Sequence, residues 1–448
     1  MQLFTLAKAL NLSCEHDATI SSCSIDSRQI QKGGLFVALK GEHTDGHKFA
    51  KDAANKGAAA ILCKEKIADV KIPQLIVPDV AQALATLAKA YRSSFKIPII
   101  ALTGSNGKTS VKEMIYAILP KPAYATKGNL NNQLGVPLSI LHLNENHTSA
   151  VFELGANHVG EIAYTANLVV PDVALINNIA PAHIGEFGSI ENIAKTKGEI
   201  FASLKPNGFA IINADDAYAN FWNENLKAKK VLRFSRKVKA DVFADNINLD
   251  INGFASFNLH FPQATTKIKL RVPGIHNVSN ALAAATCCYA INVPIQDIAF
   301  GLEKFSGVKG RLIFVKGMHE STIIDDTYNA NLRSVLAAIK VLAQQPGKKI
   351  LALGDMGELG PYASQHHKEV GEVAKNLNID LLYTCGQYTK MTCNAFGKGA
   401  FHCKNQDEMI SLISKQLDKN TTLLVKGSRL SAMEKVVAQL ALLQAHTS

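Results

Sequence analysis

The stretch that decides the fold of this chain is Ile97-Pro98-Ile99-Ile100-Ala101-Leu102-Thr103-Gly104-Ser105-Asn106-Gly107-Lys108-Thr109-Ser110. Its apolar first part has the pattern of a buried strand, and its glycines indicate a turn. The next residues are apolar at every third or fourth position, as in an amphipathic helix, and Pro120 ends the pattern. These apolar positions are Val111, Met114, Ile115, Ile118 and Leu119. A strand, a glycine turn and a helix in this order predict an α/β fold with a parallel sheet.

The same turn predicts a phosphate site. Its glycines let the backbone aim N–H groups at a phosphate, and the helix N-terminus adds partial positive charge. Lys108 can reach outer phosphates, and the Thr109 hydroxyl can bind Mg²⁺. The general pattern has a glycine where this chain has Leu102, so an ordinary strand–helix turn is the alternative. The predicted nucleotide contacts in the loop are Gly104, Asn106, Gly107, Lys108, Thr109 and Ser110.

Composition limits the functions of the chain. Its 448 residues are 47% hydrophobic and 19% charged, which excludes wholesale disorder and suits about three domains. The net charge is +11, but no run of five Lys or Arg occurs, so we expect no nucleic-acid partner. No apolar stretch reaches about 18 residues, so we expect no membrane insertion. The eight cysteines contain no CxxC pair, which favours reduced thiols and a cytoplasmic protein.

Three α/β segments follow one another along the chain. We expect a small domain over 1–96, a central domain with a mostly parallel P-loop-type sheet over 97–311, and a Rossmann-like domain over 312–448. Short hinges near residues 96 and 311 predict closure of the third domain on the second. The strands expected in the last two segments are 97–102, 150–152, 173–176, 322–324, 350–353, 381–383 and 422–425.

Polar residues follow two of these strands. Glu153 comes directly after a strand and suits the second protein ligand of a Mg²⁺ held by Thr109, although a surface glutamate is the alternative. His183 lies in a polar loop after the next strand, where a functional histidine competes with a structural one. Lys197 lies further on, and by composition alone it belongs to a solvated helix face.

Taken together, these residues resemble the Mur ligases, the ATP-dependent ligases of peptidoglycan synthesis. The resemblance extends from about Ser24 to Val437, and it is greatest to the members that join D-alanyl-D-alanine to UDP-N-acetylmuramoyl-tripeptide. The stretches that carry it are Thr103–Thr109, Gly128–Pro137, Glu153–Ile162, Lys197–Phe201, Asp325–Asn331, Leu353–Gly360 and Val425–Arg429.

The resemblance implies ATP as cofactor and an acyl phosphate as intermediate. It implies catalytic roles for Lys108, His183 and Lys197, and two Mg²⁺ sites. Thr109 and Glu153 would bind the first ion, and His183 the second. Lys197 matches the lysine that CO₂ carbamylates in the family, which converts an ammonium into a carboxylate-like metal ligand.

Further contacts are implied by position in the family motifs. The nucleotide contacts would be Asn277 and Asn280 for adenine, Arg311 for the phosphates and Asp326 for the ribose. Helix capping is the alternative for the two asparagines. The substrate contacts would be Ser27 and Arg28 for UDP, Asn131, Asn132, Asn157 and His158 for the sugar and peptide, and Lys426, Ser428 and Arg429 for the dipeptide. A plain surface cation is the alternative for Arg429.

Other functions stay open at this point. A ligase that adds one amino acid and a folylpolyglutamate synthase share the phosphate loop but not the Asn129–Pro137 and Gly354–Gly360 stretches. A nucleotide-binding regulatory protein without turnover would not need Glu153, His183 and Lys197 together. We expect a monomeric enzyme.

Overall fold

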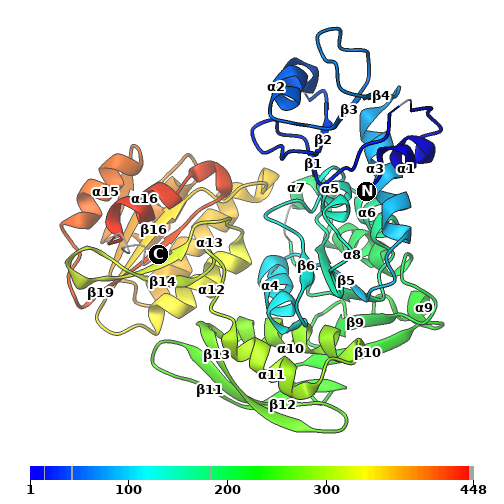
Figure 1. Ribbon diagram of the computed structural model, residues 1–448. Helices are drawn as coiled ribbons and strands as arrows, with labels where there is room; N and C mark the ends of the chain where they lie inside the picture. The colour runs from blue at the N-terminus through cyan, green and yellow to red at the C-terminus, as the bar shows by residue number, and fades with distance from the viewer. Residues whose placement is uncertain (15, 42–43, 182–183, 443–448) are drawn as a thin grey trace.

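The structure is a computed structural model that describes residues 1–14, 16–41, 44–181 and 184–442. Figure 1 shows three bodies, each a sheet flanked by helices, with the N-terminal and C-terminal bodies attached to different sides of the central one. The expected α/β architecture is therefore confirmed. Within the described ranges, no helix is long and apolar enough to cross a membrane.

The N-terminal body is a small parallel sheet in the order β1-β2-β3-β4. Asp79 begins its longest helix by accepting a hydrogen bond from the Gln82 N–H at 2.9 Å. That helix, α3, leaves the body and lies against α5 and α6 of the central one. The elements are α1 (Leu3–Ala9), β1 (Cys23–Ser24), β2 (Leu35–Val37), η1 (Gly46–Phe49), α2 (Ala50–Asn55), β3 (Ala60–Cys63), β4 (Gln74–Ile76) and α3 (Val80–Ser93).

The central body is one large sheet in the order β13-β12-β11-β10-β9-β8-β5-β7-β6. Every residue of β5 is buried, and its side chains alternate between two cores. Ile99 and Ala101 join the core that continues into the N-terminal body, whereas Ile100 and Leu102 pack under α4 and α10. Because helices cover both faces, this strand reads as a continuous apolar run.

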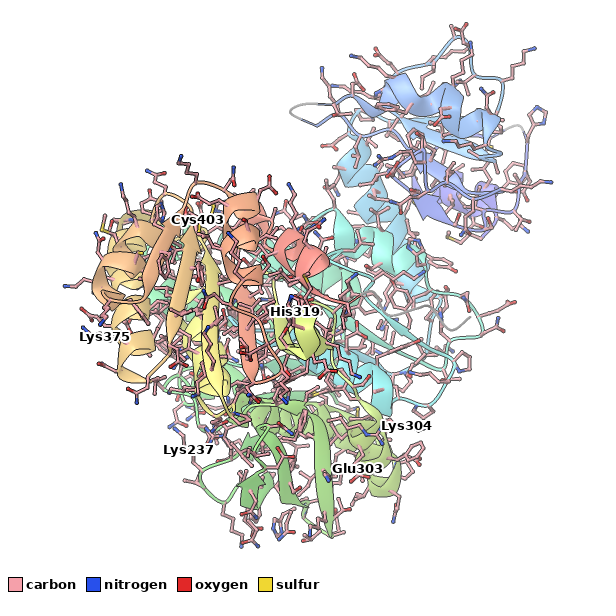
Figure 2. The ribbon with its side chains drawn as sticks, turned by 90° about the vertical axis from the view of Figure 1, so that its left-hand side faces the viewer. Lys237, Glu303, Lys304, His319, Lys375 and Cys403 are labelled. Carbon is pink, nitrogen blue, oxygen red and sulfur yellow. The ribbon has the colours of Figure 1, made fainter. Side chains whose placement is uncertain are left out.

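The elements of the central body are β5 (Ile99–Thr103), α4 (Lys108–Ile118), β6 (Ala123–Ala125), α5 (Gly135–Leu141), β7 (Ser149–Glu153), α6 (Glu161–Val169), β8 (Val173–Ile176), α7 (Ile184–Phe187), α8 (Ile190–Gly198), η2 (Glu199–Phe201), β9 (Phe209–Asn213), α9 (Asn223–Leu226), β10 (Lys230–Ser235), β11 (Val242–Leu249), β12 (Phe254–His260), β13 (Thr265–Pro273), α10 (Ile275–Ala290) and α11 (Ile295–Lys304). Strands β5 to β11 pair in parallel, and β12 and β13 add an antiparallel edge. That edge and α11, which carries Glu303 and Lys304, form the lower part of Figure 2.

The C-terminal body has a sheet in the order β14-β15-β19-β16-β17-β18, parallel except at β14. All the strands predicted for the second and third segments overlap observed strands. Figure 2 shows this body, with His319, Lys375 and Cys403, well separated from the N-terminal one. Its elements are β14 (Ile313–Lys316), η3 (Met318–Glu320), β15 (Thr322–Asp326), α12 (Leu332–Ala343), β16 (Lys348–Gly354), η4 (Gly360–Tyr362), α13 (Ala363–Asn376), β17 (Leu381–Cys385), α14 (Thr389–Phe396), β18 (Ala400–Cys403), α15 (Gln406–Ser414), β19 (Thr421–Lys426), η5 (Arg429–Ser431) and α16 (Glu434–Leu440).

Candidate active site

The phosphate loop joins β5 to α4, as predicted, and its last residue, Gly107, has to be a glycine. Gly107 is the residue before α4 and has a φ of +76°. A Cβ there would lie 2.6 Å from Oδ1 of Asn280 and 2.8 Å from Nδ2 of Asn177. A side chain at this position would therefore be strained by its backbone and would collide with two buried amides.

The side chains of Lys108 and Thr109, which follow the loop, have partners within the protein. Lys108 Nζ donates to the Gly104 carbonyl at 2.8 Å, and burial lowers the pKa of Lys108. Arg311 Nη2 donates to Thr109 Oγ1 at 2.9 Å, while its guanidinium lies 4.2 Å from the centre of the Tyr328 ring. The predicted phosphate contacts Lys108 and Arg311 therefore lie at one loop, although Arg311 is 202 positions beyond Thr109 in the sequence.

Two asparagine side chains form hydrogen bonds with the backbone of the phosphate loop. The Asn106 carbonyl accepts from Nδ2 of Asn177 at 2.9 Å and of Asn178 at 3.0 Å, and Asn178 Oδ1 accepts from the Asn106 N–H. Asn177 and Asn178 follow β8 directly, so adjacent parallel strands bring them beside the loop after β5. No role was predicted for this pair, although two amides at a strand end gave a usable signal.

The same network reaches the residues predicted to contact adenine. Asn280 Oδ1 accepts from Asn177 at 3.1 Å, and Asn280 Nδ2 donates to Asn277 Oδ1 at 2.9 Å. Both asparagines are buried on α10, and Asn277 Nδ2 donates to the Pro273 carbonyl. Their amides thus connect α10 to the phosphate loop, and adenine contact stays a prediction.

Glu153 ends β7, beside the loop that follows β5. It is 3% exposed, and its Oε1 accepts from Asn131 Nδ2 at 2.9 Å. Its Oε2 is buried and has no hydrogen-bond partner in the described part of the chain. A buried anionic oxygen left without a donor fits a cation, because burying such a charge unpaired is costly.

Lys197 is a buried residue of α8, whereas its neighbour Lys195 is exposed. The solvated helix face expected from composition is therefore wrong for Lys197. Burial, and then the charge of Lys108, lowers the pKa of Lys197 to about 7. Its Nζ lies 6.0 Å from the centre of the Phe187 ring. The charge of Glu153 in turn raises the pKa of Lys108, against the larger effect of burial, so Lys108 is electrostatically coupled to both Glu153 and Lys197.

His183, predicted to bind the second Mg²⁺, lies outside the described residues. Among the described residues there is no group of three His, Cys, Asp or Glu side chains that could hold a metal ion. The Thr109 hydroxyl and a modified Lys197 are ligands of other kinds, so the Mg²⁺ ligand set stays a prediction.

In the C-terminal body, Asp326 and Lys426 lie opposite each other at the ends of β15 and β19. Lys426 is 2% exposed, and its Nζ donates to Asp326 Oδ2 at 2.6 Å and to the Asn329 carbonyl at 2.9 Å. The partners of this lysine are thus internal, and its contact with the dipeptide stays a prediction.

The two other residues predicted to contact the dipeptide follow β19. Ser428 is buried, and its N–H donates to the Asp355 carbonyl at 2.8 Å. Arg429 is exposed and forms an ion pair with Glu434 at 3.0 Å. Arg429 is therefore a surface cation in this arrangement, with its guanidinium open to solvent.

The other predicted substrate contacts lie on loops. Arg28 is 83% exposed on its side chain and pairs with Asp26 at 2.8 Å, beside the buried Ser27. Asn157 and His158 are exposed, and their N–H groups both donate to Glu161 Oε2. Asn132 is exposed, and its Oδ1 accepts from the N–H groups of Leu134, just before α5, and of Gly135, the first residue of that helix. Of the predicted substrate contacts in the central body, the structure therefore joins only Asn131 directly to Glu153.

Sequence models of the Mur ligases match three parts of the chain. They are described as the Mur ligase family catalytic domain over residues 19–92, the Mur ligase middle domain over 102–288 and the Mur ligase glutamate ligase domain over 310–429. Each match falls on one of the three bodies seen in Figure 1.

Individual relatives cover almost the whole chain. The UDP-N-acetylmuramoyl-tripeptide–D-alanyl-D-alanine ligase of Escherichia coli (strain K12) is 42% identical over 95% of this chain and 94% of its own length. The ligase of the same name from Bacillus subtilis (strain 168) is 32% identical over 94% and 93%.

Solved structures agree with these relatives. MurF from Acinetobacter baumannii has a TM-score of 0.88 and 38% identity, and the similarity covers 97% of both chains. MurF ligase from Thermotoga maritima in complex with ADP has a TM-score of 0.80 and 27% identity, over 93% of this chain and 96% of that one. From these similarities in sequence and fold, the chain belongs to the Mur ligase family.

Proposed function

We propose that this chain is the ATP-dependent ligase that joins D-alanyl-D-alanine to UDP-N-acetylmuramoyl-tripeptide, a cytoplasmic step of peptidoglycan precursor synthesis. The observation that carries the proposal is that Lys108 follows β5 and that Glu153 ends the neighbouring parallel strand β7, with its Oε2 unpartnered among the described residues. Burial and the charge of Lys108 also lower the pKa of Lys197. The Escherichia coli relative of that name, similar over 95% of this chain, supports the choice of substrates.

The reaction joins a carboxylate to an amine in two steps. An oxygen of the terminal peptide carboxylate attacks the γ-phosphorus of ATP, and ADP leaves. The dipeptide amine then attacks the acyl carbon and loses a proton, and inorganic phosphate leaves. Many anionic oxygens come together during these two steps, so fixed positive charge and N–H donors are needed to offset their repulsion. Lys108, Arg311 and the loop N–H groups are the donors of this chain that we assign to the phosphates.

A Mg²⁺ that accompanies ATP would have Glu153 Oε2 and Thr109 Oγ1 as protein ligands, with His183 and Lys197 assigned to a second ion. The unpartnered Oε2 supports this assignment. Such an ion supplies charge neutralisation at the phosphate oxygens. In the present arrangement Thr109 Oγ1 accepts a hydrogen bond from Arg311, so Arg311 and a cation would share or compete for that oxygen.

Lys197 is the residue that we assign as carbamylated. Only a neutral amine attacks CO₂, forming an N–C bond and releasing one proton. Burial and the Lys108 charge, which lower the pKa of Lys197 to about 7, keep a large fraction of that amine neutral near neutral pH. The carbamate would present two anionic oxygens in a site that already holds the side chain of Lys108.

The remaining assignments follow the family motifs. Asn277 and Asn280 would border the adenine. Asp326, in the C-terminal domain over 312–448, would contact the ribose. The domain over 1–96 would bind UDP through Ser27 and Arg28, and the domain over 97–311 would bind ATP. Asn132, Asn157 and His158 would contact the sugar and peptide, and Lys426, Ser428 and Arg429 the dipeptide. We propose a monomer as the working unit.

The test is ADP release by the purified chain with a panel of acceptors. We expect turnover only when both the UDP-tripeptide and D-alanyl-D-alanine are present. Equal ADP release with a single amino acid in place of the dipeptide would overturn the choice of acceptor. Omission of the UDP-tripeptide gives the background of ATP hydrolysis.

A further inference from the structure

A buried lysine connects helix α4 to Thr126, the residue after β6. Lys112 lies four residues after Lys108 on α4 and is 1% exposed. Its Nζ donates to the Thr126 carbonyl at 2.7 Å and lies 2.8 Å from Glu113 Oε1. A buried lysine is costly unless its donors are placed well, so this position demands a fixed geometry.

Thr126 in turn forms a hydrogen bond with the backbone of Glu153. It follows β6 directly and is 1% exposed. Its N–H donates to the Val151 carbonyl, and its Oγ1 accepts from the Glu153 N–H, both at 3.1 Å. Lys112 therefore holds the carbonyl of Thr126, and the hydroxyl of Thr126 holds the backbone N–H of Glu153.

Asn131 holds the Glu153 side chain itself. Its Nδ2 donates to Oε1 at 2.9 Å, and its own carbonyl accepts from the Gly155 N–H at 2.8 Å. A Cβ on Gly155 would lie 3.2 Å from Asn131 Cγ, so the amide is closely packed. With Oε1 held in this way, the carboxylate directs its one unpartnered oxygen, Oε2, away from Asn131.

We propose that Lys112, Thr126 and Asn131 are positioning residues that orient Glu153 so that Oε2 meets the cation bound with the nucleotide. This inference rests on the proposed function in one respect, namely that a divalent cation binds at Glu153. It assigns Asn131 to the carboxylate rather than to the sugar or peptide. Residues that orient a metal ligand typically change metal affinity by about 10- to 100-fold.

The experiment measures ADP binding by calorimetry with and without Mg²⁺, in the parent chain and in Asn131→Ala and Thr126→Val. We expect the Kd for ADP without metal to stay within about twofold. We expect the gain in affinity on adding Mg²⁺ to shrink by about tenfold, because the carboxylate is no longer held. Mn²⁺ titration with ADP, followed by its paramagnetic resonance signal, measures the same loss directly. Equal changes with and without metal, or no change in either, would overturn the proposal.

Lys112→Met tests the far end of the chain of hydrogen bonds. We expect the same selective loss of Mg²⁺-dependent affinity, smaller than for Asn131→Ala because the contact with Glu153 is indirect. This variant removes a buried lysine and its pairing with the partly exposed Glu113, so its folding is at risk. If it does not fold, the Asn131 and Thr126 variants decide the question.

Two comparisons separate positioning from simple damage. Glu153→Gln should lose the Mg²⁺ effect alone, and adding Asn131→Ala to it should cause no further loss. Asn405→Ala, in the C-terminal body, removes the side-chain acceptor that caps α15 and should lower the Tm but leave the Mg²⁺ effect unchanged. An additive loss in the double variant would refute the coupling. The acceptor assay tests the ligase activity separately, so the two proposals can fail independently.

Discussion

Replacing Lys197 by Met should stabilise the protein, and by an amount that depends on pH. Lys197 is 4% exposed on α8, and burial with the neighbouring Lys108 lowers its pKa to about 7. In the unfolded chain the same amine titrates near 10.5. Holding the ammonium in the folded chain therefore costs up to about 5 kcal/mol, a cost that Met does not have.

The sign follows from proton counts. Between pH 7 and 10.5 the unfolded chain binds one more proton at this residue than the folded chain, so the stability of the parent rises with pH in that window. The advantage of Lys197→Met is thus about 5 kcal/mol near pH 6.5 and falls to about 2 kcal/mol at pH 9. Differences in packing between Lys and Met do not depend on pH, so the change of about 3 kcal/mol isolates the ionisation.

The assay is urea unfolding in CO₂-free buffer at both pH values, followed by tryptophan fluorescence. The sequence has a single tryptophan, Trp222, whose Nε1 donates to the Ala194 carbonyl of α8 at 3.1 Å. The signal therefore reports on the helix that carries Lys197. Lys195→Met, on the exposed side of the same helix, should show no such dependence. A pH-independent difference for Lys197→Met would refute the desolvated amine, and with it the support for carbamylation.

Three further outcomes are expected. Lys197→Ala should lose ligase activity, and added acetate should restore part of it by supplying the missing carboxylate; a folded variant without any rescue would contradict the carbamate. Asn331→Asp keeps the oxygen that caps α12 but loses the donor to Asn106 Oδ1 (2.8 Å), so ATP affinity should fall several-fold with the Tm unchanged, whereas Asn331→Ala should also lower the Tm. Lys426→Met leaves Asp326 buried and unpaired, which should destabilise the C-terminal body by about 3–5 kcal/mol in thermal unfolding. Adding Asp326→Asn should recover most of that loss, and an unchanged Tm in the single variant would contradict the buried pair.

Much of the fold could be predicted because the parallel strands are buried on both faces. Such strands, β5 and β8 among them, are short apolar runs that need no tertiary information to recognise. The strands β6, β9 to β14 and β18 were not predicted. In some of them exposed and half-buried residues interrupt the apolar pattern, as in Val242–Leu249. Strands β10 to β12 are held by hydrogen bonds to one another, and a local sequence pattern does not show such pairing.

The site was predictable where a motif joins chemistry to a strand end. The glycines around Lys108 and the position of Glu153 after a strand were sufficient to place both at one edge of the sheet. The burial of Lys197 could not be read from its helix, because Lys195 and Lys197 have the same chemistry and differ only in the direction in which they point. The contacts of Asn177 with the loop also depend on the spatial order β8-β5-β7, which the chain order conceals.

The phosphate loop is also one of the places where the C-terminal body contacts the central one. Arg311 donates to Thr109 Oγ1 in the first turn of α4, and Asn331 donates to Asn106 Oδ1 in the loop, so donors from beyond the central sheet bond to this loop and to the helix that follows it. In the proposed site, a nucleotide phosphate would compete for Arg311, and a cation would compete for the Thr109 oxygen. Any ligand that takes these partners changes the relative stability of the arrangement of the two bodies by its differential affinity. With the contacts that we propose, nucleotide binding and the position of the C-terminal body would therefore be thermodynamically linked through the side chains of this loop.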